Sequence, residues 1–258
     1  MTRRRQPGLF VTGTDTGVGK TFVAAAIARR LRSMGCAVGV MKPVETGLPA
    51  GSDDNSDAER LKAAAGIHNE PDLISPYRFA LPIAPLAAAR AARQTIEQAR
   101  VLDCYRQLAE RHDVMVVEGA GGLLVPTGPT WDMRDLILWL GLPVVLVGRA
   151  GLGGINHALL SLEALSARKA PVLALLLNET EAAENPLQRE QVATTVQLLR
   201  ERTSAPVLGP LPYQSDGGGD WLERVDRLAL DQAITEIAAS VWPEHAERPE
   251  PPHPRQAP

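Results

Sequence analysis

The sequence predicts an α/β fold in which a mostly parallel central sheet is covered by helices on both faces. Three observations support this prediction. Short apolar runs alternate along the chain with segments of helical periodicity, few polar residues interrupt the runs, and a glycine-rich turn joins the first run to the first helical segment. Solid apolar strands separated by helices are typical of a parallel sheet that is buried on both faces.

The positions of the expected elements follow from these patterns. Strands are expected at residues 9–12, 37–42, 114–118, 143–147, 172–177 and 206–208. Helices have apolar residues at intervals of three and four, and they are expected at residues 21–33, 56–65, 90–111, 133–140, 156–168, 187–201 and 221–241. The segment 71–85 contains four prolines, so it cannot form one regular element.

Composition limits the kind of protein. The 258 residues suffice for one large domain, which we place at residues 1–242, and the proline-rich segment 243–258 is expected to be a disordered tail. The net charge of −3 gives no basic field, so we expect no nucleic-acid partner. No apolar run approaches the roughly 20 residues of a membrane span, so we expect no membrane association. Two isolated cysteines, Cys36 and Cys104, favour a reducing cytoplasmic location.

The first strand and helix enclose a candidate phosphate-binding loop in the stretch LFVTGTDTGVGKTFVAAAIARRL, residues 9–31. The usual loop, G-x-x-x-x-G-K-[ST], has its first glycine six residues before the lysine. Here that position is Thr14, and the glycine lies one residue earlier, at Gly13. A glycine-rich turn with an incidental lysine is the alternative, but the strand, the glycines, the Lys-Thr pair and the helix all agree with a nucleotide loop.

Each residue type in this turn has a physical reason. Gly17 and Gly19 allow backbone conformations that a side chain would forbid, and the free N–H groups of the turn and helix N-terminus attract an anion. Lys20 would reach the β- and γ-phosphates of a nucleotide, and Thr21 would place its hydroxyl on Mg²⁺.

Polar residues at other strand and helix ends extend this site. Lys42, in VGVMKPVETG, could stabilise charge on a transferring phosphoryl group, or be a solvated surface lysine. Glu118, in DVMVVEGAGGLLVP, follows an apolar strand as the magnesium-site carboxylate of nucleotide hydrolases does, or it simply bonds to a tight turn. Asp57 follows Ser56, a plausible helix cap. With Thr21 and Glu118, Asp57 would complete a hard oxygen shell for Mg²⁺.

A second glycine-rich turn, in LVGRAGLGGINHALL, opens the helix expected near residue 156. The backbone N–H groups from Gly151 to Asn156 offer a second anion site by the same argument. His157 is better explained as a polar residue at a helix start than as a catalytic group. Asn178 ends the strand in ALLLNE, where its amide could contact an adenine edge.

These motifs, in this order, resemble the dethiobiotin synthetase family, ATP-dependent carboxylases that close the ureido ring in biotin synthesis. The matching stretches lie between Phe10 and Tyr213, and they are FVTGTDTGVGKT, KPVETG, NSDA, SPYRF, VEGAGGLLVP, GLGGINHALL, LLLNE and LGPLPY. The shifted glycine is then that of a variant phosphate loop. The segment after Tyr213, including residues 217–219, matches no motif of the family.

The resemblance implies a P-loop NTPase-type fold and a specific reaction. One amine of 7,8-diaminononanoate takes up CO₂, the resulting carbamate attacks the γ-phosphorus of ATP, and the second amine closes the ring and expels phosphate. By similarity, Lys20 and Lys42 are catalytic, and Thr21, Asp57 and Glu118 hold Mg²⁺. The residues expected to bind the nucleotide are Gly17, Val18, Gly19, Lys20, Thr21, Phe22, Asp57, Glu118, Gly119, Ala120, Gly121, Asn178, Glu179, Pro210, Leu211 and Pro212.

The resemblance also implies a homodimer with substrate sites at the subunit interface. Thr46 is expected to contact the substrate. The substrate carboxylate, at the far end of an apolar chain, needs its own anion site, and we expect Gly151, Gly154 and Asn156 of the other subunit to supply it.

Three alternatives from other classes stay open at this point. A partition-type regulatory ATPase carries a signature lysine five residues before the second one, where this chain has Asp15. The synthetase half of a cobyrinate-type amidase needs a glutaminase domain, which only a separate chain could supply here. A noncatalytic nucleotide-binding module would not require the strand-end lysine and carboxylates.

Overall fold

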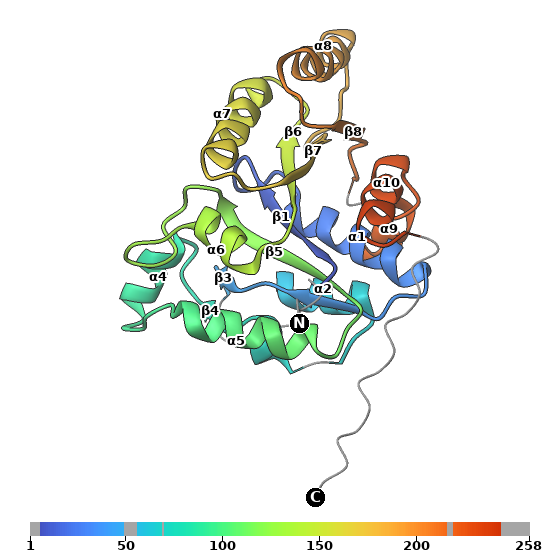
Figure 1. Ribbon diagram of the computed structural model, residues 1–258. Helices are drawn as coiled ribbons and strands as arrows, with labels where there is room; N and C mark the ends of the chain where they lie inside the picture. The colour runs from blue at the N-terminus through green and yellow to red at the C-terminus, as the bar shows by residue number, and fades with distance from the viewer. Residues whose placement is uncertain (1–5, 49–55, 69, 216–218, 244–258) are drawn as a thin grey trace, which may run out of the picture.

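A computed structural model describes residues 6–48, 56–68, 70–215 and 219–243. In it, a six-stranded sheet lies between two layers of helices (Figure 1). The strand order is β2-β5-β1-β6-β7-β8, and every pairing in this sheet is parallel. The predicted fold class is therefore confirmed. Most of the expected tail at 243–258 and two of the three glycines at 217–219 lie outside the described residues.

The six strands predicted for the main sheet are all present. They are β1 (Gly8–Gly13), β2 (Val38–Met41), β5 (Val114–Gly122), β6 (Val144–Arg149), β7 (Val172–Asn178) and β8 (Val207–Leu211). The largest difference is at β5, which continues for four residues beyond the expected end at Glu118. After a register shift, Gly122 still pairs with Gly13 of β1, because glycines leave the two backbones room to stay adjacent. Glu118 therefore lies within a strand.

Five of the predicted helices match the structure closely. They are α1 (Lys20–Ser33), α2 (Asp57–Ala65), α6 (Met133–Leu140), α7 (Gly154–Ala167) and α8 (Pro186–Arg202). The single helix predicted at 90–111 was wrong, because α4 (Pro85–Ala91) ends before Arg93, which has a left-handed backbone (φ 53°), and α5 (Gln98–Ala109) starts separately. The helix predicted at 221–241 is likewise two helices, α9 (Trp221–Leu228) and α10 (Gln232–Val241). Asp231 separates them by capping α10 with its side chain.

A small second sheet was not predicted. Pro43 ends β2, but the chain re-enters a strand at once, as β3 (Val44–Thr46). This strand pairs in parallel with β4 (Tyr77–Phe79), which follows the short helix α3 (Pro71–Ile74) in the proline-rich segment. Strands of three residues are too short to show an alternating pattern. The second sheet matters for function because β3 carries Glu45 and Thr46 into the site described below.

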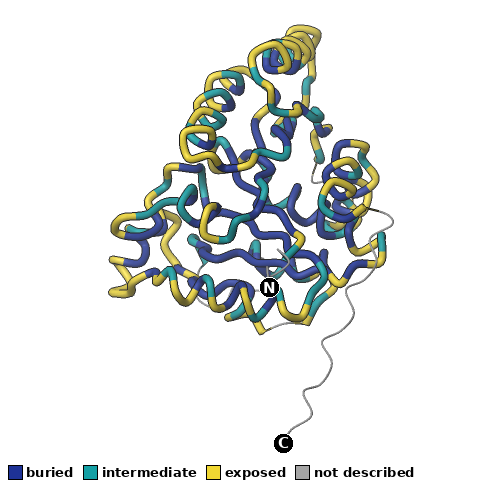
Figure 2. Tube along the Cα trace, in the orientation of Figure 1, coloured by how far each residue is buried: buried dark blue, intermediate teal, exposed yellow. Residues whose placement is uncertain are grey.

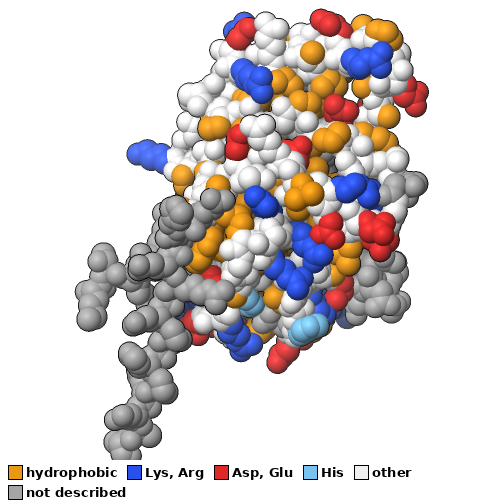
Figure 3. All heavy atoms as spheres, turned by 90° about the vertical axis from the view of Figure 1, so that its right-hand side faces the viewer, with side chains coloured by type: hydrophobic (Ala, Val, Ile, Leu, Met, Phe, Trp, Pro, Cys, Tyr) orange, Lys and Arg blue, Asp and Glu red, His pale blue; other side chains and the backbone are white. Residues whose placement is uncertain are grey.

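The main sheet is buried on both faces (Figure 2). Along β1, Leu9 and Val11 pack on the side of α1, α2 and α10, whereas Phe10 packs on the side of α5, α6 and α7. Since both faces are occupied by apolar contacts, polar groups gather beyond the carboxyl ends of the strands, as is general for such sheets. On the surface turned toward the viewer in Figure 3, acidic and basic side chains are interspersed. No helix in the described ranges combines the length and apolarity needed to cross a bilayer.

Candidate active site

The loop between β1 and α1 has the shape of an anion cradle. Gly17 and Gly19 both adopt left-handed backbone conformations, with φ of 77° and 94°. Gly19 caps α1, so the helix N-terminus points into the loop. The backbone N–H of Thr14 donates to the carbonyl of Val147 on β6 at 2.9 Å, which anchors the start of the loop to the sheet. The conformations expected for the two glycines are therefore present.

Lys20 lies buried under this loop. Its ammonium donates to the carbonyl of Asp15 at 2.8 Å, so the side chain folds back along the cradle. Burial, together with the positive charge of Lys42, lowers the pKa of Lys20 to about 8. Its ammonium therefore has a partner of only partial charge, and a bound phosphate would stabilise it further.

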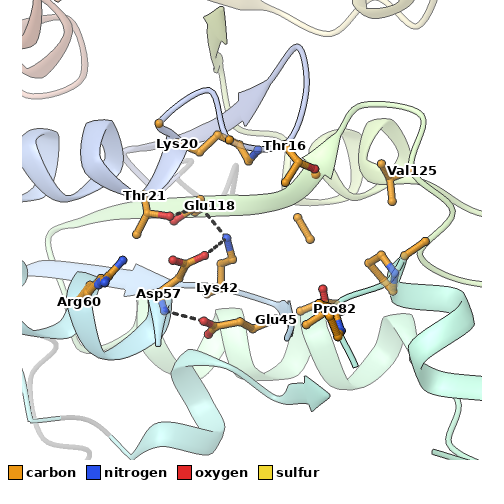
Figure 4. A pocket seen from close by; sticks show the side chains of 18 of the residues that line it. Thr16, Lys20, Thr21, Lys42, Glu45, Asp57, Arg60, Pro82, Glu118 and Val125 are labelled. Atoms are coloured by element: carbon orange, nitrogen blue, oxygen red, sulfur yellow. Dashed lines mark hydrogen bonds and ion pairs between the residues drawn. The ribbon is translucent and has the colours of Figure 1, made fainter. Parts of the chain in front are cut away.

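Lys42 connects the other predicted residues (Figure 4). Its Nζ lies 2.5 Å from Oε1 of Glu118 and 2.9 Å from Oδ2 of Asp57. The hydroxyl of Thr21 donates to the same Oε1 of Glu118 at 2.9 Å. The carbonyl of Gly119 is 3.4 Å from the Lys42 ammonium. Three elements, α1, α2 and β5, and the residue after β2 thus bring their polar groups to one point, as the sequence predicted.

The charges in this group are strongly coupled. Burial alone would lower the pKa of Lys42, but Glu118 and Asp57 outweigh it and raise that pKa above its ordinary value. Burial would raise the pKa of Asp57, but the Lys42 ammonium outweighs it and lowers that pKa. Burial raises the pKa of Glu118, which Lys42 opposes. Lys42 therefore stays protonated at neutral pH, and it is no surface lysine.

Glu45 fixes the position of Asp57, a role that sequence reasoning missed. Its carboxylate accepts from the backbone N–H of Asp57 at 2.5 Å and of Ala58 at 3.3 Å. Glu45 thus satisfies free N–H groups at the N-terminus of α2 from a different element, while Ser56 accepts from Glu59 as the local cap. The only sequence signal was a charged residue in KPVETG, which does not reveal its partner.

The oxygen ligands fit a magnesium ion. Thr21, Asp57 and Glu118 present one hydroxyl and two carboxylates to the same space. Oε2 of Glu118 is buried and has no hydrogen-bond partner among the described residues, so it has a free coordinating position. Within the same ranges there is no group of three or more His, Cys, Asp or Glu suited to a metal. A shell of one or two carboxylates completed by water and phosphate is typical of Mg²⁺.

These groups open into a cavity of about 680 Å³. Arg60 lies at one end, beside Asp57 and Thr21, and Pro82 and Val125 lie at the other (Figure 4). Of the predicted residues, those that line it are Gly17, Gly19, Lys20, Thr21, Phe22, Lys42, Thr46, Asp57, Glu118, Ala120 and Gly121. Apolar side chains also line the cavity, including Val44, Pro82, Ile83, Pro85 and Val125. The cavity therefore combines charged groups with apolar walls.

A second cavity of about 290 Å³ adjoins the first. It is lined by Asn178, Glu179 and Tyr213, among others, and the side-chain amide of Asn178 donates to the carbonyl of Val18 at 3.0 Å. Leu211 is fully buried in the core, and Pro210 lines a different groove beside α8. The expected nucleotide contacts of residues 210–212 remain a prediction. Tyr213, Gln214 and Trp221 line the second cavity instead, and sequence reasoning did not assign them a role.

The second glycine-rich turn lines neither of these two cavities. Gly153 caps α7 with a left-handed backbone (φ 84°), as Gly19 caps α1, so the two helix starts have the same geometry. However, Gly151, Gly154 and Asn156 do not line the cavity with the two lysines. Within one chain, therefore, these three residues do not reach the cavity that holds Lys20 and Lys42.

Comparison with known proteins gives a consistent result. Residues 7–219 match a protein family described as an AAA domain. The chain is 47% identical over 209 residues to the ATP-dependent dethiobiotin synthetase BioD of Anaeromyxobacter dehalogenans (strain 2CP-C), covering 81% of this chain and 91% of that protein. It is 40% identical to the enzyme of the same name from Thermodesulfovibrio yellowstonii, covering 81% and 90%.

Solved structures of similar fold come from proteins of other kinds. A ParA family ATPase from Chlorobium tepidum TLS aligns with a TM-score of 0.51 and 17% identity, covering 90% of this chain and 97% of that one. The MinC:MinD cell division complex of Aquifex aeolicus gives a TM-score of 0.51 at 15% identity, covering 91% and 95%. At these identities the likeness concerns the fold alone.

The lowered pKa of Lys20 leads to a test of its contact with phosphate. Because its pKa is about 8, its ammonium loses the proton as the pH rises through that value, and affinity for ADP should then fall. Near pH 8, a bound phosphate should draw about half a proton from solution. Calorimetric titration of ADP in two buffers of different ionisation enthalpy measures this uptake. A Lys20→Arg variant, which stays charged, should show none; equal uptake in both proteins would contradict the assignment.

Proposed function

The chain belongs to the family of ATP-dependent dethiobiotin synthetases, and from that membership we propose that it carboxylates 7,8-diaminononanoate and closes the ring to dethiobiotin. ATP and CO₂ are the co-substrates, and ADP and phosphate are released. The observation that carries this proposal is the cavity itself. Two lysines and a magnesium-type oxygen shell lie in this cavity, and its wall also offers Thr46 and apolar side chains of the kind that a nine-carbon chain needs.

The first chemical requirement is to bring two anions together. A carbamate formed from one substrate amine must attack the γ-phosphorus of ATP, which itself carries negative charge. Lys20, under the loop, and Lys42, on the floor of the cavity, provide fixed positive charge on the path between them. Charge stabilisation of this kind is strong where groups are preorganised and water is excluded. The carbamate is the nucleophile, so no protein nucleophile is needed.

The magnesium ion would be held by Thr21, Asp57 and Glu118. When bound, it neutralises phosphate charge and orients the phosphate oxygens. Its ligands are the carboxylates that also bind Lys42, so the protein's own cation is held directly beside the metal shell. Glu45 contributes indirectly, because its bonds to the start of α2 hold Asp57 in place.

Ring closure requires orientation more than further charge. After phosphoryl transfer, the second amine attacks the carbonyl carbon of the carbamic–phosphoric anhydride, the C–O bond to phosphate breaks, and phosphate leaves with its electron pair. Thr46 lies on the cavity wall where it can bind an amine, and the adjacent apolar residues can hold the alkyl chain. Holding both amines near one carbon makes the second step intramolecular.

The second glycine-rich turn, at residues 151–156, is the proposed binding site for the substrate carboxylate. We propose a two-fold homodimer in which Gly151, Gly154 and Asn156 of one subunit bind this carboxylate beside the phosphate loop of the other. The exposed leucines near this turn support the proposal, since Leu152 at the turn and Leu160 on α7 are 79% and 57% exposed. Leu124, after β5, shares a surface hollow with Leu160. We also propose a cytoplasmic location, consistent with two cysteines that form no disulfide.

Product formation is the direct test of the proposed function. The protein should convert diaminononanoate, bicarbonate, ATP and Mg²⁺ into dethiobiotin, detected by mass spectrometry, with one phosphate released for each ring closed. Omission of diaminononanoate or of ATP should abolish formation of dethiobiotin. Turnover of ATP that does not depend on diaminononanoate, without dethiobiotin, would contradict the proposal and favour a regulatory ATPase.

Lys42→Ala should reduce kcat by about two to three orders of magnitude with little change in KM for ATP, because Lys42 is placed at the developing charge. Steady-state kinetics at saturating substrates measure this split. The matched control is Lys62→Ala, a lysine on α2 that pairs with Glu59 and lines no part of the site. Because Lys42→Ala leaves two buried carboxylates without their cation, thermal melting and ADP binding must show that it is folded. A folded variant of normal kcat would refute the role.

Mixed dimers test the shared site. Lys20→Ala alone should be inactive, and Asn156→Asp should raise KM for diaminononanoate at least tenfold by repelling its carboxylate, leaving KM for ATP unchanged. The assay uses diaminononanoate far below the raised KM, where Asn156→Asp alone is nearly inactive. When the two variant chains are mixed and allowed to exchange, each mixed dimer has one site built from unmutated residues, so activity should rise above that of either variant. If native mass spectrometry shows mixed dimers and activity does not rise, each subunit binds its substrate alone.

A further inference from the structure

The two cavities of the site meet at a specific group of residues. Five residues line both of them: Gly17, Gly19, Phe22, Arg60 and Trp221. The larger cavity holds the two lysines and the metal-type ligands, and the smaller one holds Asn178 and Tyr213. A nucleotide with its base in the smaller cavity and its γ-phosphate beside Lys20 must therefore cross this junction. Its inner phosphates, α and β, lie nearest to the crossing.

Arg60 is the one charged side chain that lines both cavities among the described residues. It lies on α2, three residues after Asp57, so the helix carries both side chains toward the same face. Figure 4 shows Arg60 at the end of the cavity beside Asp57 and Thr21, opposite the apolar end at Pro82 and Val125. Within the described ranges its guanidinium forms no ion pair with a carboxylate.

Aromatic contacts hold Arg60 in this place. Its guanidinium carbon lies 5.7 Å from the centre of the Trp221 ring, which is within the range of a cation–π interaction. Trp221 in turn packs edge-on against Phe22 of α1, with ring centres 6.3 Å apart. A guanidinium that stacks on a ring through its face keeps its N–H groups free at its rim. Arg60 is therefore held rigidly, with its donors available to a ligand.

We propose that Arg60 binds the α- and β-phosphates of the nucleotide as a third fixed cation, and that Trp221 is the residue that positions it. The inference rests on the proposed function, because it assumes that a nucleotide crosses the junction. The proposal gives the three cations different phosphates to bind. Lys20 and Lys42 face the transferring phosphoryl group, whereas Arg60 faces phosphates that keep their charge throughout. Arg60 should therefore contribute to nucleotide binding and not to the rate of the chemical step.

This division gives a clear signature in binding. Arg60→Gln should weaken ADP binding about tenfold, the order expected for loss of a hydrogen-bonded ionic contact at a partly buried site. Adenosine, which has no phosphate, should bind the wild type and Arg60→Gln with equal affinity. Arg60→Lys should recover part of the loss, because it keeps the charge but not the planar fork. Trp221→Leu should weaken ADP about threefold through loss of the cation–π contact. Isothermal titration calorimetry with ADP and adenosine measures these affinities for the wild type and the three variants.

The matched control is Lys62→Gln, which removes a positive charge from the same helix outside both cavities. It should leave ADP affinity within about twofold of the wild type. In steady-state assays, Arg60→Gln should raise KM for ATP by the same factor as the ADP dissociation constant, with kcat near that of the wild type. Circular dichroism melts of each variant confirm folding.

Several outcomes would overturn the inference. These are unchanged ADP affinity in Arg60→Gln, an equal loss in Lys62→Gln, an equal loss for adenosine, or a fall in kcat with KM unchanged. The proposed function fails separately. If the wild-type protein binds ADP and makes no dethiobiotin, only the reaction is wrong. If it makes dethiobiotin and Arg60→Gln binds ADP normally, only the role of Arg60 is wrong.

Discussion

The arrangement of the site depends on one buried interaction, the contact of the Lys42 ammonium with the carboxylates of Glu118 and Asp57. Glu118 is fully buried in the central sheet, where an unpaired carboxylate would be costly. Lys42 makes that burial tolerable, and removing one partner from such a group typically costs about 3–5 kcal/mol. Because the three residues come from β5, α2 and the residue after β2, the interaction also fixes how these elements meet. The P-loop helix joins them through Thr21.

Much of this could be predicted, because the relevant signals are local in sequence. The phosphate loop is a contiguous motif, so Gly17, Gly19 and Lys20 could be assigned without knowledge of distant contacts. The convergence of Lys42 and Glu118 followed from a general rule, since β2 and β5 are parallel and adjacent and their carboxyl ends lie on the same edge. The expected strand end at Glu118 was still wrong, because glycines after it prolong the pairing with β1.

The features that were not predicted depend on contacts between residues far apart in the chain, or on single residues that interrupt a helical pattern. The bond from α2 to Glu45 joins β3, a strand too short for periodicity, to a helix that begins after an intervening loop. The contact of Arg60 with Trp221 joins residues on α2 and α9, and no local feature of either segment indicates the other. The helix breaks near Arg93 and Asp231 are local, yet each interrupts a continuous helical periodicity through one residue's backbone conformation or capping bond.

The two lysines of the site have opposite electrostatic environments, and this difference suits the separate roles proposed for them. Lys20 bonds to a carbonyl and has a lowered pKa, so its charge is poorly compensated in the free protein, and a bound phosphate would relieve that cost. Lys42 has a raised pKa and two carboxylate partners, so most of its charge is already compensated. A cation bound by the same carboxylates would share that compensation and expose more of the charge of Lys42 to a neighbouring anion. In the proposed function, Lys20 would therefore favour nucleotide binding, and Lys42 would become most effective once the metal and the nucleotide are both bound.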